Sequence, residues 1–195
     1  MALKLLGVGG SMRAGSSSTH TVGLCLGLAS RLGAEVRLLD LRTADLPMFR
    51  PDAEAGEGAV AVGEAVRWAD AFVLGTPDYH GSMSGAMKNF LDYHWEEFAG
   101  KLFGYVCSSH EKGLTAMDQM RTAVRQCYGW SLPYGVSVHS EQDFDAAGGS
   151  VSPRLRQRLA MVARDLVAYG ALLRRQFQDD VAGGAADTFA ARYAE

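Results

Sequence analysis

Short apolar runs alternate along this chain with longer segments in which apolar residues recur at three- and four-residue spacing. The runs predict five β-strands, at residues 3–9, 35–41, 71–76, 102–108 and 135–139. The periodic segments predict helices at residues 18–32, 58–69, 84–96, 114–128 and 153–175. Regular alternation of the two is typical of βαβ units, whose right-handed crossovers cover both faces of a parallel sheet. We therefore expect an α/β fold, with a doubly wound, five-stranded parallel sheet in a three-layer α/β/α sandwich.

The segment at 84–96 illustrates how buried and exposed positions separate within one predicted helix. Its buried face is expected to hold Met83, Met87, Phe90, Leu91 and either His94 or Trp95. Its opposite, polar face is expected to hold Lys88, Asn89 and Asp92.

Two segments fall outside this alternation. Residues 42–57 are interrupted by prolines and predict a long surface loop, of the kind that serves as a lid or a contact surface. Residues 176–195 predict a tail beyond a single domain at 1–175. Within the tail, Thr188–Tyr193 suits a short amphipathic helix that docks on a neighbour.

Length and composition narrow the function. At 195 residues, of which 48% are apolar, the chain is long enough to bury a proper core. The 19 Lys and Arg residues are spread along the chain, and the net charge of −3 argues against a nucleic-acid partner. No segment reaches the roughly 20 apolar residues of a membrane span, and the start of the chain does not resemble a signal peptide. We expect neither a membrane partner nor secretion.

The cysteines also argue against a secreted protein. Cys25, Cys107 and Cys127 lie far apart and form no Cys-x-x-Cys pair. They predict structural thiols in a reducing compartment, hence a cytoplasmic protein, and no metal site.

The first predicted strand opens into a stretch suited to a phosphate. Gly9 and Gly10 let the backbone turn sharply, and the following helix aims its free N–H groups at the same point. The donors gathered there are the hydroxyls of Ser11, Ser16, Ser17, Ser18 and Thr19 and the guanidinium of Arg13. In the alternative interpretation, the hydroxyls only cap the helix and the glycines only serve the turn.

Two nucleotide motifs can be tested against this stretch. Gly10 and Gly15 have the spacing of a P-loop, but Ser16 stands where its lysine is required. The dinucleotide fingerprint fails as well, because Met12 takes the place of its third glycine. A mononucleotide with a terminal phosphate is the better ligand.

Two further strand ends carry polar and aromatic residues, and ligands of open α/β sheets bind where such ends converge. After the third strand, Pro77 sets one backbone angle and Gly81 gives room for a flat ring to approach Asp78, Tyr79 and His80. Alternatively, Tyr79 is a half-buried aromatic residue and His80 a surface histidine. After the fourth strand come Ser108, Ser109 and His110.

These motifs together resemble one family. Three stretches carry the resemblance: Gly10-Ser11-x-Arg13-x-x-Ser16, Thr76-Pro77-Asp78-Tyr79-His80-Gly81-Ser82 and Gly85-Ala86-Met87-Lys88-Asn89-x-x-Asp92. They are similar to motifs of the NADPH-dependent FMN reductases, a flavodoxin-like family that includes chromate, quinone and azo reductases. The resemblance spans roughly residues 3–170. It implies FMN bound by its phosphate at Ser11, Arg13, Ser16 and Ser18. The same resemblance places the isoalloxazine at Pro77, Asp78, Tyr79, His80 and Gly81, with Ser108, Ser109 and His110 near the other edge of the ring.

The implied activity is carried by the flavin, so no catalytic side chain is expected, and Tyr79, His80 and His110 only line the ring. NADPH or NADH would give a hydride to FMN, and a free flavin, quinone, azo or nitro compound or chromate would then take it in a ping-pong cycle. Backbone N–H groups near Tyr79 to Gly81 would stabilise the negative charge of the reduced flavin. Two departures affect the ring edge, since Asp78 replaces a more usual glutamate and Ser84 a more usual proline.

Two other classes of function stay open. An FMN-binding electron carrier or redox sensor would share the site but not turn over. A hydrolase is suggested by Gly81-Ser82-Met83-Ser84-Gly85, although Met83 stands where the nucleophile of such an elbow belongs.

Assembly is a separate expectation. Lys88, Asp92, Tyr93, Trp95 and Phe98 would lie near the crevice and favour a homodimer or homotetramer, unless the three aromatic residues among them are ordinary core.

Overall fold

The computed structural model describes residues 1–145, 149, 152–184 and 186–193. Its strands are β1 (Lys4–Gly9), β2 (Glu35–Asp40), β3 (Ala71–Pro77), β4 (Leu102–Ser108), β5 (Trp130–Ser131) and β6 (Val136–Val138). Its helices are α1 (Ser17–Arg31), α2 (Glu57–Trp68), α3 (Gly85–Asp92), α4 (Leu114–Gln126), α5 (Ser140–Asp143) and α6 (Pro153–Gly183), with 3-10 turns η1 (Glu96–Phe98) and η2 (Phe189–Tyr193).

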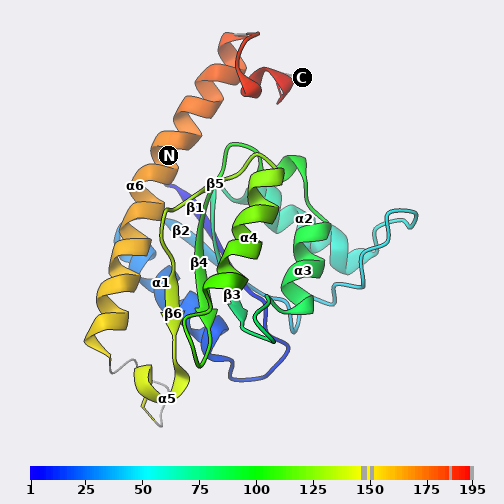
Figure 1. Cartoon of the computed structure of the whole chain (residues 1–195). Coiled ribbons are helices and arrows are strands. Elements are labelled where there is room, and N and C mark those ends of the chain that lie inside the picture. Colours follow the sequence, from blue (N-terminus) through cyan, green and yellow to red (C-terminus); the bar gives the residue numbers. More distant parts are fainter. Residues whose placement is uncertain (146–148, 150–151, 185, 194–195) are drawn as a thin grey trace.

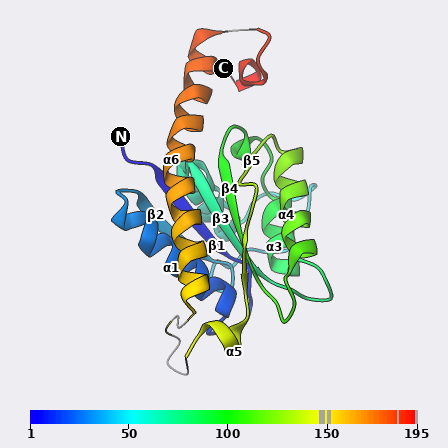
Figure 2. The same ribbon diagram turned by 60° about the vertical axis from the view of Figure 1, so that its left-hand side comes forward.

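The strands form one parallel sheet in the order β2-β1-β3-β4, with β5 and β6 both paired to the outer side of β4. Helices α1 and α6 cover one face, and α2, α3 and α4 cover the other (Figures 1 and 2). The predicted doubly wound, three-layer fold is confirmed. Among the described residues, no helix has both the length and the apolar character needed to cross a membrane.

The fifth strand differs from the prediction of 135–139, because two short pieces fill its place. β5 pairs with the start of β4 and β6 with its end. Between them the Leu132 N–H still donates to the Phe103 carbonyl at 2.8 Å. The next residue, Pro133, has no N–H to continue the ladder, which explains the break.

A separate core packs on each face of the sheet. On the side of α2, α3 and α4, the ring of Phe72 stacks on Phe103 with centroids 4.6 Å apart. On the other side, α1 approaches β1 so closely that a Cβ on Gly7 would lie 2.5 Å from the side chain of Val22. Burial on both faces is why the central strands read as continuous apolar runs.

Helix α3 ends at Asp92, four residues before the predicted end at 96, and one residue of its predicted polar face is buried. The side-chain oxygen of Asn89 accepts from the Phe49 N–H at 2.7 Å, and its amide donates to the Pro47 carbonyl at 2.8 Å. Asn89 therefore fastens the loop at 42–57 to α3. Of the two candidates for the inner face, His94 is buried and Trp95 is 64% exposed.

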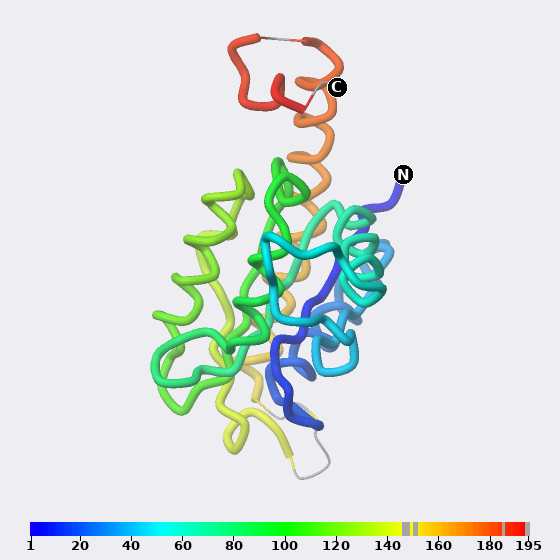
Figure 3. The backbone as a smooth tube through the Cα atoms, turned by 90° about the vertical axis from the view of Figure 1, so that its right-hand side faces the viewer, coloured from blue at the N-terminus to red at the C-terminus, as the bar shows by residue number. Residues whose placement is uncertain are grey.

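Helix α6 continues past the predicted end at 175 to Gly183 and stops at Gly184, whose φ of 61° is left-handed. Figure 3 shows these last turns and the C-terminal segment standing clear of the sheet. The predicted helix near 188–193 is present as η2 and docks on its own chain. Phe189 stacks on Tyr128 and meets Phe177, with ring centroids 6.1 and 5.7 Å apart.

Candidate functional site

The carboxyl ends of β1, β3 and β4 open into a crevice of about 160 Å³. Its lining is Ser11, Arg13, Ser16, Ser17, Pro77, Asp78, Tyr79, Ser108, Ser109, His110 and Ser140. The structure thus brings together most of the predicted site residues, from all three predicted loops. Ser18, His80 and Gly81 do not line the crevice.

The first loop turns off β1 at a position where only glycine fits. The Gly10 N–H donates to the Gly75 carbonyl at 2.7 Å. A Cβ on Gly10 would lie 2.9 Å from Met87 and 3.0 Å from that same carbonyl. The close approach of β3 and α3 therefore fixes the path of the loop.

The hydroxyls at the start of α1 divide into two roles. Ser16 is the N-cap and accepts a long hydrogen bond from the Thr19 N–H at 3.5 Å, as the capping interpretation predicts. The Ser16 hydroxyl also lies 2.9 Å from that of Ser18, which is fully buried beneath the crevice. The Ser11 hydroxyl accepts from the Arg13 N–H at 3.2 Å, which folds the loop around the same point.

Several donors remain without partners in this cradle. Within the described chain, the N–H groups of Ser17 and Ser18 have no acceptor, as the first turn of a helix requires. Arg13 lines the crevice and forms no ion pair with any described residue, so its guanidinium is available to a ligand. An anion at this point would meet these donors and the positive end of the helix dipole. The residues present therefore fit a phosphate group.

The second loop is a two-residue hairpin turn. Tyr79 and Ser82 exchange both backbone hydrogen bonds, at 2.9 and 3.0 Å. The intervening residues, His80 and Gly81, both have left-handed backbones with φ of 57° and 75°, as a type I′ turn requires. Both residues are exposed and lie outside the crevice lining.

Asp78 holds the second and third loops together. One carboxylate oxygen accepts from the Gly81 N–H at 2.8 Å, and the other accepts from the Ser109 hydroxyl at 2.9 Å. Its own N–H donates to the Ser108 carbonyl at 2.8 Å. Its carboxylate is thus engaged by the protein.

These bonds alter one expectation about the ring. The N–H groups of Tyr79 and Gly81 were expected to face the ligand, but both have acceptors within the loop. Among the three residues of that stretch, only the His80 N–H has no acceptor in the described chain.

Ser84 explains the second departure from the family pattern. Its hydroxyl donates to the Gly10 carbonyl and caps α3 by accepting from the Met87 N–H at 3.1 Å. Its N–H donates to the Thr76 hydroxyl at 2.9 Å. A proline would have neither the hydroxyl nor the N–H, so serine joins the first loop to the second in a way that proline does not. The Ser84 hydroxyl is committed to these contacts and forms no hydrogen bond with a histidine in the described part of the chain, so it lacks the base that a hydrolase nucleophile requires.

The third loop carries His110, whose ring packs edge-on against His139 at 5.3 Å. Ser140, just beyond β6, was missed by the sequence analysis. The strand-end rule would have found it if it had been applied to the fifth strand as well as the other three. Ser17 was recognised as a donor but not counted in the site.

A doubly wound parallel sheet in the order 2-1-3-4-5, flanked by helices on both faces, defines the flavodoxin-like fold class. The crystal structure of an apo NADH:FMN oxidoreductase superposes with a TM-score of 0.74 and 18% identity, covering 86% of this chain and 90% of that one. This likeness supports the fold.

The family model described as NADPH-dependent FMN reductase matches residues 3–143. An NAD(P)H-dependent FMN reductase of Pseudomonas aeruginosa is 34% identical over 166 residues, which cover 80% of this chain and 88% of the relative. An NAD(P)H-dependent FAD/FMN reductase of Geobacillus thermodenitrificans is 29% identical over 172 residues, or 85% and 92% of the two chains. The chain belongs to the NADPH-dependent FMN reductase family and is an NAD(P)H-dependent oxidoreductase of the flavin reductase type.

Proposed function

We propose that the protein holds FMN in this crevice as a resident cofactor, takes a hydride from NADPH or NADH and passes it to a small acceptor in a ping-pong cycle. The observation that carries the proposal is the set of unpartnered donors at the start of α1, namely the N–H groups of Ser17 and Ser18 and the guanidinium of Arg13, which lines the crevice. Bound FMN would supply the hydride chemistry itself.

The protein's part in this proposal is to bind and orient the flavin. Ser11, Ser16 and Ser18 and the guanidinium of Arg13 would hold the phosphate, since guanidinium and hydroxyl donors suit its oxygens. Pro77 to Tyr79 and Ser108 to His110, which line the crevice, would flank the ring, whereas His80 and Gly81 lie outside the crevice lining. The Tyr79 side chain is 51% exposed at the mouth of the crevice and would cover part of the ring.

The acceptor would be a free flavin, a quinone, an azo or nitro compound or chromate. Asp78 would lie at the edge of the ring. Both of its carboxylate oxygens already accept hydrogen bonds from the protein, so it is not free to act on an incoming acceptor. A site with no dedicated acid or base discriminates weakly between acceptors.

The deciding experiment is an absorbance spectrum of the purified protein before and after anaerobic addition of NADPH. Flavin bands that bleach with NADPH are the expected result. A protein that shows no flavin bands even after incubation with FMN contradicts the proposal. Steady-state NADPH oxidation with added quinone then separates an enzyme from an electron carrier, because a carrier would be reduced once and stop.

We also propose a homodimer or homotetramer. Trp95 is 64% exposed and Met48, in the loop that Asn89 fastens to α3, is 74% exposed. A second copy would cover these two apolar side chains, whereas Phe98, also predicted for this surface, is fully buried and belongs to the core. Light scattering that reports only the 20.9 kDa monomer would contradict this assembly.

A cytoplasmic location is proposed from the cysteines. Cys25, Cys107 and Cys127 are free and buried in the structure. Burial, which dominates, and a smaller effect of Asp78 raise the pKa of Cys107 to about 12, so its thiol stays protonated.

A further inference from the structure

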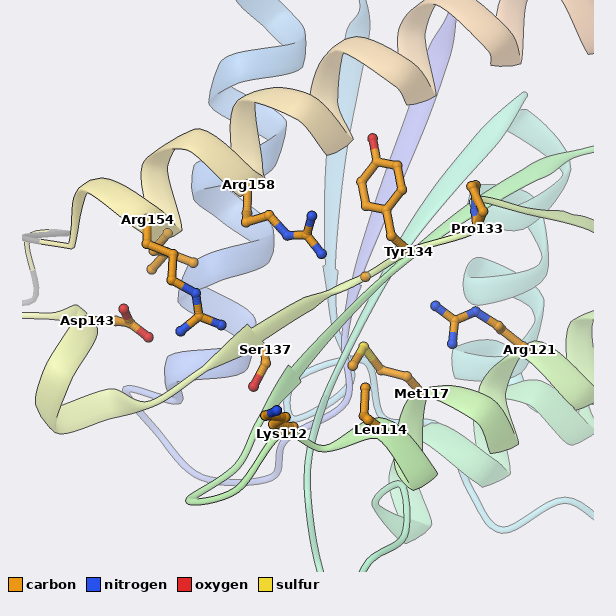
Figure 4. A pocket seen from close by; sticks show the side chains of 12 residues that line it. Lys112, Leu114, Met117, Arg121, Pro133, Tyr134, Ser137, Asp143, Arg154 and Arg158 are labelled. Carbon is orange, nitrogen blue, oxygen red and sulfur yellow. The ribbon is translucent and has the colours of Figure 1, made fainter.

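A second and larger cavity, of about 400 Å³, lies along the outer edge of the sheet between α4 and α6. Figure 4 shows side chains from three elements meeting around it: Arg121 from α4, Tyr134 beside β6, and Arg154 and Arg158 from α6, with Lys112 of the third loop at one end. The volume is within the range of sites that hold small organic ligands.

The charge of this cavity is strongly positive. Lys112, Arg154 and Arg158 form no ion pair with any residue that the structure describes. The Arg158 guanidinium lies over the ring of Tyr134, 5.2 Å from its centroid, which holds the charge beside the cavity. Arg121 is the exception, since it pairs with Asp118 at 2.7 Å.

Of the nearby carboxylates, Asp143 offsets part of this positive charge and Asp165 is engaged elsewhere, so the lining keeps a net positive charge. Asp143 lines the wall but is buried, and it accepts from the His139 N–H at 2.8 Å. Asp165 accepts from the Tyr134 hydroxyl and pairs with Arg164 at 2.7 Å. Three unpaired cations around one hollow are therefore left for a ligand.

We propose that this cavity is a binding site for a phosphomonoester carried on a small organic group. Guanidinium forks match the oxygens of a phosphate dianion, and such an anion balances several cations at once. The remaining walls, from Leu114, Met117 and Pro133, are apolar and suit the group that carries the phosphate.

The position of the cavity suggests two sources for the phosphate. Lys112 belongs to the same loop as Ser109 and His110, which line the flavin crevice, so the two cavities share this loop as a wall. The first source is the 2′-phosphate of NADPH, reaching across the loop, and this case rests on the proposed function. The second is a separate phosphorylated metabolite.

The test is calorimetric titration of the FMN-saturated protein with adenosine 2′,5′-bisphosphate, with adenosine as the phosphate-free probe. The double variant Arg154→Gln/Arg158→Gln is expected to bind the bisphosphate about ten-fold or more weakly, as for lost hydrogen bonds to a charged group. The matched control, Arg156→Gln, changes an exposed arginine of the same helix that does not line the cavity and should bind as the wild type does. Absence of saturable binding, or equal binding by the two variants, would overturn the proposal.

Two further measurements assign the source and separate the two sites. A higher KM for NADPH but not for NADH in the double variant identifies the coenzyme as the source. Unchanged KM values with lost bisphosphate binding identify a separate ligand. The Arg13→Ala protein should still bind the bisphosphate. If this variant loses bisphosphate binding, the probe binds in the FMN crevice, and the assignment to the second cavity is overturned. If the absorbance spectrum shows no flavin, the proposed function fails. Bisphosphate binding that depends on Arg154 and Arg158 would still support the second site by itself.

Discussion

At the scale of single residues, the crevice depends on side chains that hold loops as much as on those that face a ligand. Asp78 and Ser84 were noted in the sequence only as departures from a family pattern. In the structure Asp78 joins the second loop to the third, and Ser84 joins the first to the second. Neither role could be derived from spacing, because the partners are distant in the sequence.

Substitution of Arg13 should change FMN affinity without changing the stability of the fold. Replacing it with alanine is expected to weaken FMN binding by about 1.5–3 kcal/mol, the usual loss of a hydrogen bond to a charged group, without reducing the cooperativity of unfolding. Quenching of flavin fluorescence gives the affinity. Arg31→Ala, at the far end of α1 from the loop that carries Arg13, is the matched control and should bind FMN normally. Unchanged affinity in Arg13→Ala would remove this residue from the phosphate site.

Substitution of Ser84 should lower the free energy of unfolding. The variant Ser84→Ala leaves the buried Gly10 carbonyl without its donor and removes the cap of α3, at a cost of about 1–3 kcal/mol in the free energy of unfolding. Urea denaturation measures the loss. Ser82→Ala should cost less, because among the described residues the Ser82 hydroxyl is bonded to the Gln119 side chain alone, at 3.1 Å. Equal losses in the two variants would argue against the linking role of Ser84.

At the scale of elements, the central strands and the first helices follow the hydrophobic pattern to within one or two residues. These segments are buried on a regular face, so their periodicity is complete. The hydrophobic pattern fails where one residue determines the local structure. Pro133 interrupts the fifth strand, and Asn89 is buried because its side chain bonds to the distant loop at 42–57. The three crevice loops were found by the strand-end rule, but the hairpin turn at His80 depends on backbone angles that the rule does not describe.

The end of α6 offers a test at this scale. Gly100 has φ of 73°, and a Cβ there would lie 2.4 Å from the ring of Phe177. Gly100→Ala should therefore displace the end of α6 and destabilise the protein by about 1–3 kcal/mol, a cost typical of overpacking and of strain at a left-handed residue. Thermal unfolding with near-ultraviolet circular dichroism follows both effects.

The matched glycine is Gly27 of α1, where a Cβ meets nothing within 4 Å. Gly27→Ala should stabilise by about 0.5–1 kcal/mol, because alanine is the better helix former. A stability loss in this variant similar to that in Gly100→Ala would show that contact with Phe177 is not the cause.

At the scale of the whole molecule, one buried histidine should set part of the acid sensitivity. Neither ring nitrogen of His94 has a hydrogen-bond partner in the described chain. Burial is the main cause that lowers the pKa of His94 from 6.5 to about 4, with Arg67 and Lys101 adding to it and Glu97 opposing it. Between these two values the unfolded chain binds a proton that the folded chain does not, so stability is full above about pH 6.5 and falls towards pH 4.

The variant His94→Phe, which keeps a ring beside Phe90 and Phe98, should remove this dependence. The expected difference in pH sensitivity between wild type and variant is about 3 kcal/mol from pH 7 to pH 4, measured by urea denaturation at each pH. His20→Phe alters an exposed histidine and should leave the slope as in the wild type. A His94→Phe protein with the wild-type slope would show that other groups account for the acid sensitivity.

The bonds that Ser84 makes to Gly10 and Thr76 have a kinetic consequence. Because they fix the relative positions of two loops within the protein alone, little rearrangement is left for an incoming flavin to drive. Stopped-flow mixing should then give a single exponential phase whose observed rate grows in proportion to flavin concentration, with no plateau from a slow closure step. The Ser84→Ala protein keeps the N–H bond to Thr76 but loses the hydroxyl bond to Gly10, so the first loop is held less firmly against the second. This variant should reach such a plateau, and a one-step encounter becomes a gated one.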